Sequence, residues 1–211
     1  MMINKIHEQE ELQKIIYTFA ELFKYPTQDF YEEVSAGHVD EGLKSLFSNL
    51  QFDIIADLKG KCLSKENLQQ QYMDLFSGLK QPFAPPIESV YKVWTTDETA
   101  QVSIAKSKGY LMGDPALHMQ YLYKQFQIEV PNGYENMPDH LTLQLEFLAY
   151  LLETSNQEVI YQFIDDHLDW LDDFHNELKK IEVSDFYSHA TRLLQLFLQN
   201  ITRSIFDTRK E

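Results

Sequence analysis

The sequence predicts an all-α fold, a single helical bundle of roughly nine to eleven helices. Glycine is scarce, at 7 of 211 residues, whereas tight turns between strands consume glycine. Apolar residues recur at three- and four-residue steps along most of the chain, and no alternating strand pattern competes with them. A chain of this length buries a sizeable core without a disulfide or a metal, so we expect one domain over residues 1–211.

The first part of the chain predicts three helices. An apolar stripe runs through residues 8–24 and ends before Pro26. Thr27 is a suitable N-cap for a short second helix that ends near Val34. Residues 37–42 begin and end with glycine and are expected to form a connection, followed by a weaker helical pattern.

The middle of the chain is the least regular part. Ser64 predicts the start of a helix, and Gly78 predicts its end. Three prolines then interrupt residues 80–89, for which we expect an irregular, exposed connection because proline breaks the helical hydrogen-bond ladder. The helical pattern resumes near Ser89. Further on, Thr95 and Glu98 have the spacing of a capping box, which predicts a helix start.

The last hundred residues again predict helices. The segment from Pro138 to about Glu153 is apolar on most of its circumference and should therefore lie at the centre of the fold. The helical pattern that follows is expected to break near His167. Helix starts are indicated, in chain order, at Asp114, Pro138, Ser155 and Ser184.

The charge of the chain limits its partners. The 18 Lys and Arg against 33 Asp and Glu give a formal net charge of −15, which repels phosphate backbones and anionic lipid. Residues 125–178 carry 12 of the acids and no Lys or Arg. We therefore expect neither nucleic acid nor a membrane surface as a partner. This acidic tract is either a solvated surface or a face for a basic partner.

The sequence carries no recognisable catalytic or metal motif. Cys62 is the only cysteine, and there is no glycine-rich phosphate loop, G-x-S-x-G or H-E-x-x-H. The nearest approximations to a helical metal site are Asp172 with His175 and the cluster at residues 165–167, whose acids are expected at exposed positions. We therefore expect no metal and no cofactor.

Nothing in the sequence indicates a targeting or membrane segment. The N-terminus lacks the apolar core of a signal peptide and turns acidic at once. Residues 141–152 are the most apolar stretch, and they are too short and too polar to span a bilayer. A cytoplasmic protein is expected.

Three local features suggest a binding surface. An aromatic and leucine ridge occupies residues 71–78, a stiff proline loop occupies residues 82–91, and Asp139 and His140 are placed in the first turn of the apolar helix. Taken alone, each is an ordinary core ridge, loop or helix start. Together they predict a peptide groove with a polar end.

Taken in order, these stretches resemble the TorD/DmsD/NarJ family of redox-enzyme maturation chaperones, and the likeness covers about residues 68–174. A further likeness lies in residues 163–174. One departure is that Tyr72 stands where DmsD-like members often carry tryptophan. The motifs that carry the resemblance are Tyr72-x-x-Leu75-Phe76-x-Gly78, Pro82-x-x-Pro85-Pro86-x-Glu88-Ser89-Val90-Tyr91 and Pro138-Asp139-His140.

The resemblance implies a helical cytoplasmic chaperone without catalytic activity. Such a protein binds the twin-arginine signal peptide and precursor of a molybdenum-cofactor oxidoreductase and supports its maturation before export or membrane assembly; NarJ-like relatives serve clients that stay in the cytosol. Domain-swapped dimers occur in the family, so a homodimer stays open, as do nucleotide and molybdenum-cofactor contacts. The peptide-binding residues implied by motif position are Tyr72, Leu75, Phe76, Pro85, Pro86, Glu88, Tyr91, Asp139 and His140.

The residues themselves fit this reading. A twin-arginine peptide has a basic head, which suits the acidic tract, and an apolar run, which suits the aromatic ridge. Two other classes of function stay open. One is a helical adaptor that binds a folded partner through its acidic face. The other is an enzyme that uses Asp139 and His140 as an acid–base pair.

Overall fold

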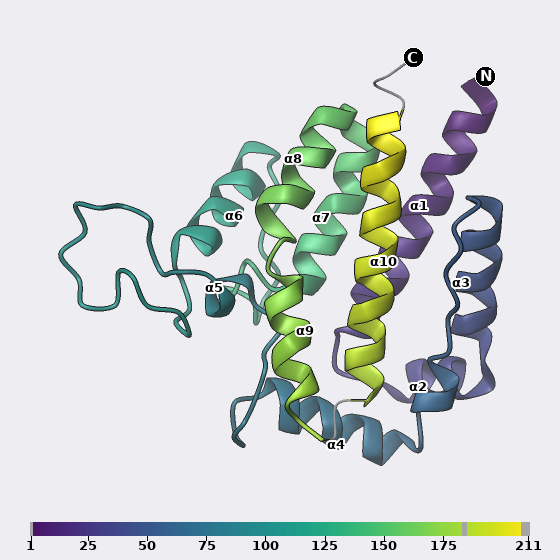
Figure 1. The fold of residues 1–211 in the computed structure, drawn as a ribbon, viewed down its shortest axis with the longest axis horizontal. Helices are drawn as coiled ribbons and strands as arrows, with labels where there is room; N and C mark the ends of the chain where they lie inside the picture. Colours follow the sequence, from purple (N-terminus) through teal and green to yellow (C-terminus); the bar gives the residue numbers. More distant parts are fainter. Residues whose placement is uncertain (1, 183–184, 208–211) are drawn as a thin grey trace.

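The protein is an all-α bundle, as the sequence predicts. The computed structural model describes residues 2–182 and 185–207, and these form ten α-helices, one short 3-10 helix and a single isolated β-bridge (Figure 1). In chain order the helices are α1 (Met2–Leu22), α2 (Gln28–Ala36), α3 (His38–Asn49), η1 (Lys59–Lys61), α4 (Lys65–Phe76), α5 (Glu88–Tyr91), α6 (Asp114–Gln125), α7 (Leu141–Thr154), α8 (Gln157–His167), α9 (Leu171–Lys179) and α10 (Asp185–Asp207).

Helix α7 forms the centre of the bundle, which confirms the prediction from its apolar circumference. It packs along α1 on one side and against α8 on another, while α10 packs against α1, α8 and α9. The amides of Gln9 and Gln13 on α1 donate to the carbonyls of Leu152 and Ala149, at 2.6 and 2.9 Å. The two central helices are therefore held together by polar contacts as well as by buried apolar surface.

Aromatic side chains fill the core between the N- and C-terminal helices. Phe197 of α10 meets the rings of Phe19, Phe47 and Phe52 with centroids 5.7, 6.2 and 6.1 Å apart. Large buried rings remove much apolar area from water and add favourable edge and face contacts. The last helix is therefore packed against α1, α3 and the segment that follows α3.

The helix starts predicted at Thr27 and Ser64 agree with the structure, whereas α1 begins at Met2 rather than near residue 8, and one predicted connection is wrong. The side chains of Thr27 and Ser64 accept hydrogen bonds from backbone N–H groups in the first turns of α2 and α4. The predicted connection over residues 37–42 is wrong, because α3 begins directly after Gly37. This glycine has a φ of 93°, which lets one residue both end α2 and begin α3.

Two predicted helix starts in the second part are shifted. Gly113, not Asp114, is the N-cap of α6, and Asn156, not Ser155, caps α8 with a side chain that accepts a backbone hydrogen bond. The break near His167 is confirmed, because α8 ends there. Ser184, predicted as the cap of the last helix, lies outside the described residues.

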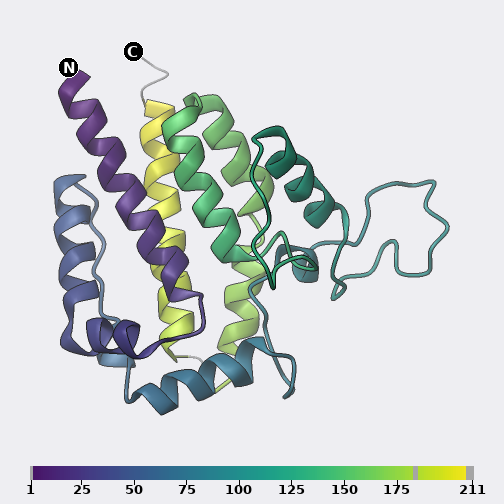
Figure 2. The same ribbon diagram turned by 180° about the vertical axis from the view of Figure 1, so that it is seen from behind.

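Residues 92–113 form a long loop, so the helix start predicted at Thr95 and Glu98 is wrong. The middle of this loop projects away from the bundle (Figures 1 and 2). The Thr95 hydroxyl donates to the carboxylate of Asp114 at 2.9 Å, so it ties the loop to α6 rather than capping a helix of its own. Short polar side chains stabilise loops as readily as helix ends, which is why the spacing misleads.

The connection over residues 80–89 is irregular as predicted, but only its first half is exposed. Residues 80–83 lie on the surface, whereas residues 84–89 are buried. The Ala84 N–H donates to the carbonyl of Leu75 at 2.7 Å, and the Pro86 carbonyl accepts from the N–H of Leu141 at 2.8 Å. Pairing with two other segments satisfies this backbone and allows its burial.

The most apolar helix, α7, has 14 residues, whereas about 20 apolar residues are needed to span a bilayer. Within residues 2–182 and 185–207 no helix is both long and apolar enough to cross one.

Candidate peptide-binding groove

A groove of about 1190 Å³ opens where four parts of the chain meet: the C-terminal end of α4, residues 80–89 (the proline segment), the loop before α7 and helix α9. The loop over residues 92–113 also contributes to the lining of the groove, through Lys108, Gly109 and Leu111. Its lining residues are Tyr72, Phe76, Ser77, Gly78, Phe83, Pro85, Pro86, Ile87, Val90, Tyr91, Lys108, Gly109, Leu111, Gly133, Tyr134, Met137, His140, Asp173 and Glu177.

The apolar wall of the groove is a cluster of packed rings. The Tyr72 and Phe76 centroids lie 5.0 Å apart, and Phe76 meets the buried ring of Tyr187 at 4.7 Å. Burial raises the pKa of Tyr72 to about 12, so this wall is uncharged at neutral pH. Rigid, uncharged rings suit an apolar segment of peptide.

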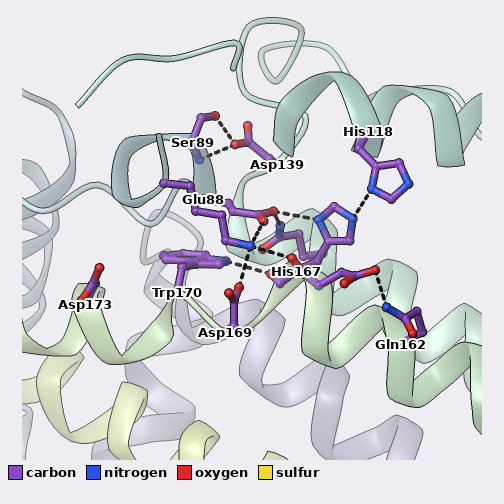
Figure 3. A network of polar contacts seen from close by, with 12 residues as sticks. Glu88, Ser89, His118, Asp139, Gln162, His167, Asp169, Trp170 and Asp173 are labelled. Carbon is purple, nitrogen blue, oxygen red and sulfur yellow. Dashed lines mark hydrogen bonds and ion pairs between the residues drawn. The ribbon is translucent and has the colours of Figure 1, made fainter. Parts of the chain in front are cut away.

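The proline segment and the start of α7 form one structural unit. Ile87 and His140 pair as an isolated antiparallel bridge. The Glu88 N–H donates to the carbonyl of Asp139 at 3.2 Å, and the Ser89 N–H donates to the Asp139 carboxylate at 2.7 Å. The Ser89 hydroxyl donates to the same carboxylate oxygen (Figure 3).

The sequence predicts Asp139 in the first turn of the apolar helix. This prediction is wrong, because α7 begins at Leu141 and Asp139 lies before it. Its side chain is fully buried. Burial raises the pKa of this carboxyl, and the two hydrogen bonds from Ser89 oppose the rise. The carboxylate fixes the Ser89 backbone to the base of α7.

His140 is the N-cap of α7. Its Nδ1 accepts a hydrogen bond from the Thr142 N–H at 3.2 Å, and its ring meets that of Tyr134 edge-on at 5.1 Å. Burial lowers the pKa of this imidazole to about 4, so it is neutral near pH 7, as an acceptor at Nδ1 must be. The ring reaches the groove and forms part of its lining.

Beneath the groove lies a buried carboxylate with several partners. Glu88 has no exposed surface, and its carboxylate accepts a hydrogen bond from the Gln144 amide and pairs with the Lys92 ammonium at 2.8 Å. Nδ1 of His167 lies 2.9 Å from the same carboxylate, and its Nε2 lies 2.8 Å from Nδ1 of His118 (Figure 3). This network joins α5, α6, α7 and α8.

Lys92 carries the countercharge of this network. Burial lowers the pKa of its ammonium, but the carboxylates of Glu88 and Asp169 outweigh burial and raise it. Burial and the neighbouring His167 lower the pKa of His118. At neutral pH the network therefore consists of buried Glu88, charged Lys92 and a neutral His118 at its outer end.

A comparison with known protein families shows the family to which this chain belongs. Residues 37–177 match the family model described as "Nitrate reductase delta subunit". The chain belongs to this family. Every residue that lines the groove falls within the matched segment.

Two curated proteins that are similar in sequence to this chain are named as chaperones. "Chaperone protein TorD" from Vibrio cholerae serotype O1 (strain ATCC 39315) is 31% identical over 144 residues, which cover 63% of this chain and 59% of the relative. "Probable Tat proofreading chaperone DmsD" from Haemophilus influenzae is 30% identical over 155 residues, covering 71% of this chain and 70% of that protein. The chain thus spans less than two thirds of the length of the first relative.

A solved structure shares the fold of this chain. It comes from Archaeoglobus fulgidus, and its description carries the term redox enzyme maturation protein. The two chains are 21% identical with a TM-score of 0.55, and the match covers 87% of this chain and 93% of the other.

The structure places the nine residues that the family resemblance implied in two groups. Leu75, Glu88 and Asp139 are fully buried and lie beneath the groove. The others line it: Tyr72, Phe76, Pro85, Pro86, Tyr91 and His140.

Several lining residues lay outside the sequence prediction. Asp173 and Glu177 belong to the acidic tract, which the sequence did single out, although nothing distinguished these two acids from the rest. Lys108 and Leu111 lie on the long loop, where only the tertiary fold brings them to the groove.

The residues weighed as a metal site do not converge. His167 faces Glu88, whereas His175 lies 3.2 Å from the hydroxyl of Ser188. In the described part of the chain, no group of three or more His, Cys, Asp and Glu side chains is placed to hold a metal ion.

Proposed function

We propose that this protein is a cytoplasmic chaperone, without catalytic activity, for the precursor of a molybdenum-cofactor oxidoreductase. Its groove takes the twin-arginine signal segment of the precursor and so supports maturation before export or membrane assembly. The observation that carries the proposal is that the whole lining of an aromatic groove falls within the family segment. The names of the relatives, one of them a Tat proofreading chaperone, support it.

The groove and the acidic tract match the two halves of such a segment. Covering roughly 400 Å² of apolar peptide surface gives about 10 kcal/mol at 25 cal/mol per Å². Ordering the peptide and losing its free motion cost several kcal/mol of that. We therefore expect dissociation constants no tighter than about 1 μM, which suits a chaperone that must release its client.

Replacing Phe83 by serine should weaken peptide binding about fivefold, because the ring is 38% exposed in the free protein and a bound apolar segment would cover it. The measurement is calorimetric titration with a synthetic peptide that has two adjacent arginines followed by leucines and alanines. Leu63→Ser, at a residue that is 78% exposed and outside the groove, is the matched control and should bind like the wild type.

If Phe83→Ser and Leu63→Ser bind the peptide equally well, the groove is not its site. If the wild type does not bind the peptide at all but does bind a folded partner protein, the adaptor function is favoured instead.

Replacing both arginines of the peptide by glutamine should weaken binding and flatten its dependence on salt. Exposed charge pairs contribute only about 0.2–1 kcal/mol each, and salt screens them. Titrations of both peptides at low and high ionic strength measure this effect. Equal affinities and equal salt slopes for the two peptides would contradict a role for the arginines.

A further inference from the structure

One end of the groove is polar and contains an unpaired hydroxyl. Tyr91 is 6% exposed, and its ring stacks on Trp170 at 5.2 Å and meets Phe174 at 5.7 Å. Its hydroxyl is buried and has no hydrogen-bond partner among the described residues. A buried hydroxyl without a partner is uncommon and costs free energy, so it points to a group that binds there.

Two carboxylates accompany this hydroxyl. Asp173 and Glu177 line the groove from α9, where residues four positions apart lie on the same face. Burial raises the pKa of Tyr91, and the charges of Glu177 and Asp173 raise it further, so the hydroxyl stays protonated within reach of their field. In Figure 3 Asp173 lies on α9, away from the buried network around Glu88.

A lysine from the long loop already reaches this end of the groove. Lys108 pairs with Asp173 at 2.9 Å, and both side chains are 56% exposed. The Gly109 N–H donates to the carbonyl of Val90 at 2.9 Å, which holds this limb of the loop against α5. Glu177 pairs with Lys180 at the surface, at 2.6 Å. Exposed pairs of this kind are weak and exchange readily with another cation.

We propose that Tyr91, Asp173 and Glu177 form a subsite for a guanidinium group of the client segment, and that Lys108 occupies part of this subsite when no client is bound. This inference rests on the proposed function. A guanidinium has five N–H donors in a planar fork and can bridge two carboxylates and a hydroxyl, whereas an ammonium is a single point of charge. The subsite should therefore prefer arginine to lysine.

The subsite also adjoins the apolar wall. Phe174, which touches the ring of Tyr91, lies 6.2 Å from the ring of Phe76. A segment with arginine in the subsite can therefore place its apolar run directly on the aromatic wall. The subsite and the aromatic wall therefore follow one another in the same order as the basic head and the apolar run of the client segment.

The test uses the full-length protein and three synthetic peptides, which carry Arg-Arg, Lys-Lys or Gln-Gln before the same run of leucines and alanines. Asp173→Asn and Glu177→Gln should each weaken binding of the Arg-Arg peptide roughly two- to fivefold and leave the Gln-Gln peptide unchanged. Glu153→Gln removes the same charge from an exposed site on α7 and should have less than about a twofold effect. The wild type should bind the Arg-Arg peptide more tightly than the Lys-Lys peptide.

Lys108→Met should have the opposite effect and strengthen binding of the Arg-Arg peptide roughly two- to fivefold, because the competing ammonium is gone. Lys124→Met, at an exposed position on α6 outside the groove, changes the net charge equally and is the control. Weaker binding by Lys108→Met would overturn the role of Lys108 as a competitor.

Tyr91→Phe separates binding from folding. Removing a hydroxyl that has no partner should leave the melting temperature unchanged or higher. Affinity for the Arg-Arg peptide should nevertheless fall roughly threefold or more. A residue that served the fold alone would not give this combination.

The outcomes also separate this inference from the proposed function. If the wild type binds the Arg-Arg peptide and the variants at Tyr91, Asp173 and Glu177 all behave like the controls, the subsite is wrong while the chaperone function stands. If no peptide binds to the wild type, the proposed function itself fails.

Discussion

Replacing Glu88 by alanine should lower the free energy of unfolding by about 2–6 kcal/mol, because two buried polar groups lose a hydrogen-bond partner, at about 1–3 kcal/mol each, and Lys92 loses one of its two carboxylate partners. The two groups are the Gln144 amide and the His167 ring, whereas the Lys92 ammonium keeps the carboxylate of Asp169 at 2.6 Å. Lys92 keeps 25% of its side-chain surface in contact with water, so the expected loss lies at the lower end of this range. Urea denaturation at pH 7 measures it.

Two further variants separate the contribution of the Glu88 charge from that of its hydrogen bonds and from the effect of an exposed substitution. Glu88→Gln keeps a hydrogen-bond acceptor but removes the charge, and should lower the stability by about 1–3 kcal/mol. Glu98→Ala, on the exposed surface of the long loop, should change it by no more than about 0.5 kcal/mol. A Glu88→Ala variant as stable as Glu98→Ala would show that the network does not support the fold.

The helical architecture could be predicted because it depends on local periodicity. The core-facing stripe of α10 and the apolar circumference of α7 follow directly from the order of residues. The caps at Thr27 and Ser64 are local as well, since each side chain bonds to an N–H group three residues ahead.

The burial of the proline segment could not be predicted in this way. Prolines predict that residues 80–89 are irregular, but the burial of their second half depends on pairing with Asp139 and Leu141, about fifty residues away. The same long-range pairing explains why α7 begins after His140 rather than at Pro138. The backbone and side chain of Asp139 are already committed to Glu88 and Ser89.

Only the part of the groove that depends on local sequence could be predicted. A local ridge such as Tyr72 with Phe76 is visible in the sequence, because residues four apart share a helix face. The polar end of the groove is not visible, because Lys108, Tyr91 and Asp173 come from three separate segments. The buried positions of Glu88 and Asp139 indicate that these motif residues shape the groove from below rather than line it.

The pH dependence of stability should carry a contribution from His140. Its pKa is about 4 in the folded protein, against 6.5 for a histidine side chain in water. Above pH 6.5 both states are neutral and the residue contributes nothing. Between pH 6.5 and 4 the unfolded chain binds a proton that the folded protein does not, so the free energy of unfolding falls as the pH falls. The loss is complete below pH 4 and amounts to about 3 kcal/mol, at 1.36 kcal/mol per pKa unit.

Other groups titrate in the same range. The pKa values of His118, His175 and His189 are also lowered, mainly by burial, and these residues contribute with the same sign. Asp139 acts in the opposite sense, because its raised pKa lets the folded protein bind a proton first as the pH falls. The slope for the wild type alone therefore cannot be assigned to one residue.

His140→Asn isolates the contribution, because asparagine is a good N-cap that does not titrate. Any loss of packing in this variant is the same at every pH and cancels in the comparison. Relative to the wild type, the variant should gain about 3 kcal/mol of stability between pH 7 and pH 4, measured by urea denaturation at several pH values. Leu63→Asn, at a residue that is 78% exposed and does not titrate, should give a curve parallel to that of the wild type. If the His140→Asn curve is also parallel, the imidazole titrates alike in both states, and its burial at the groove does not hold it neutral.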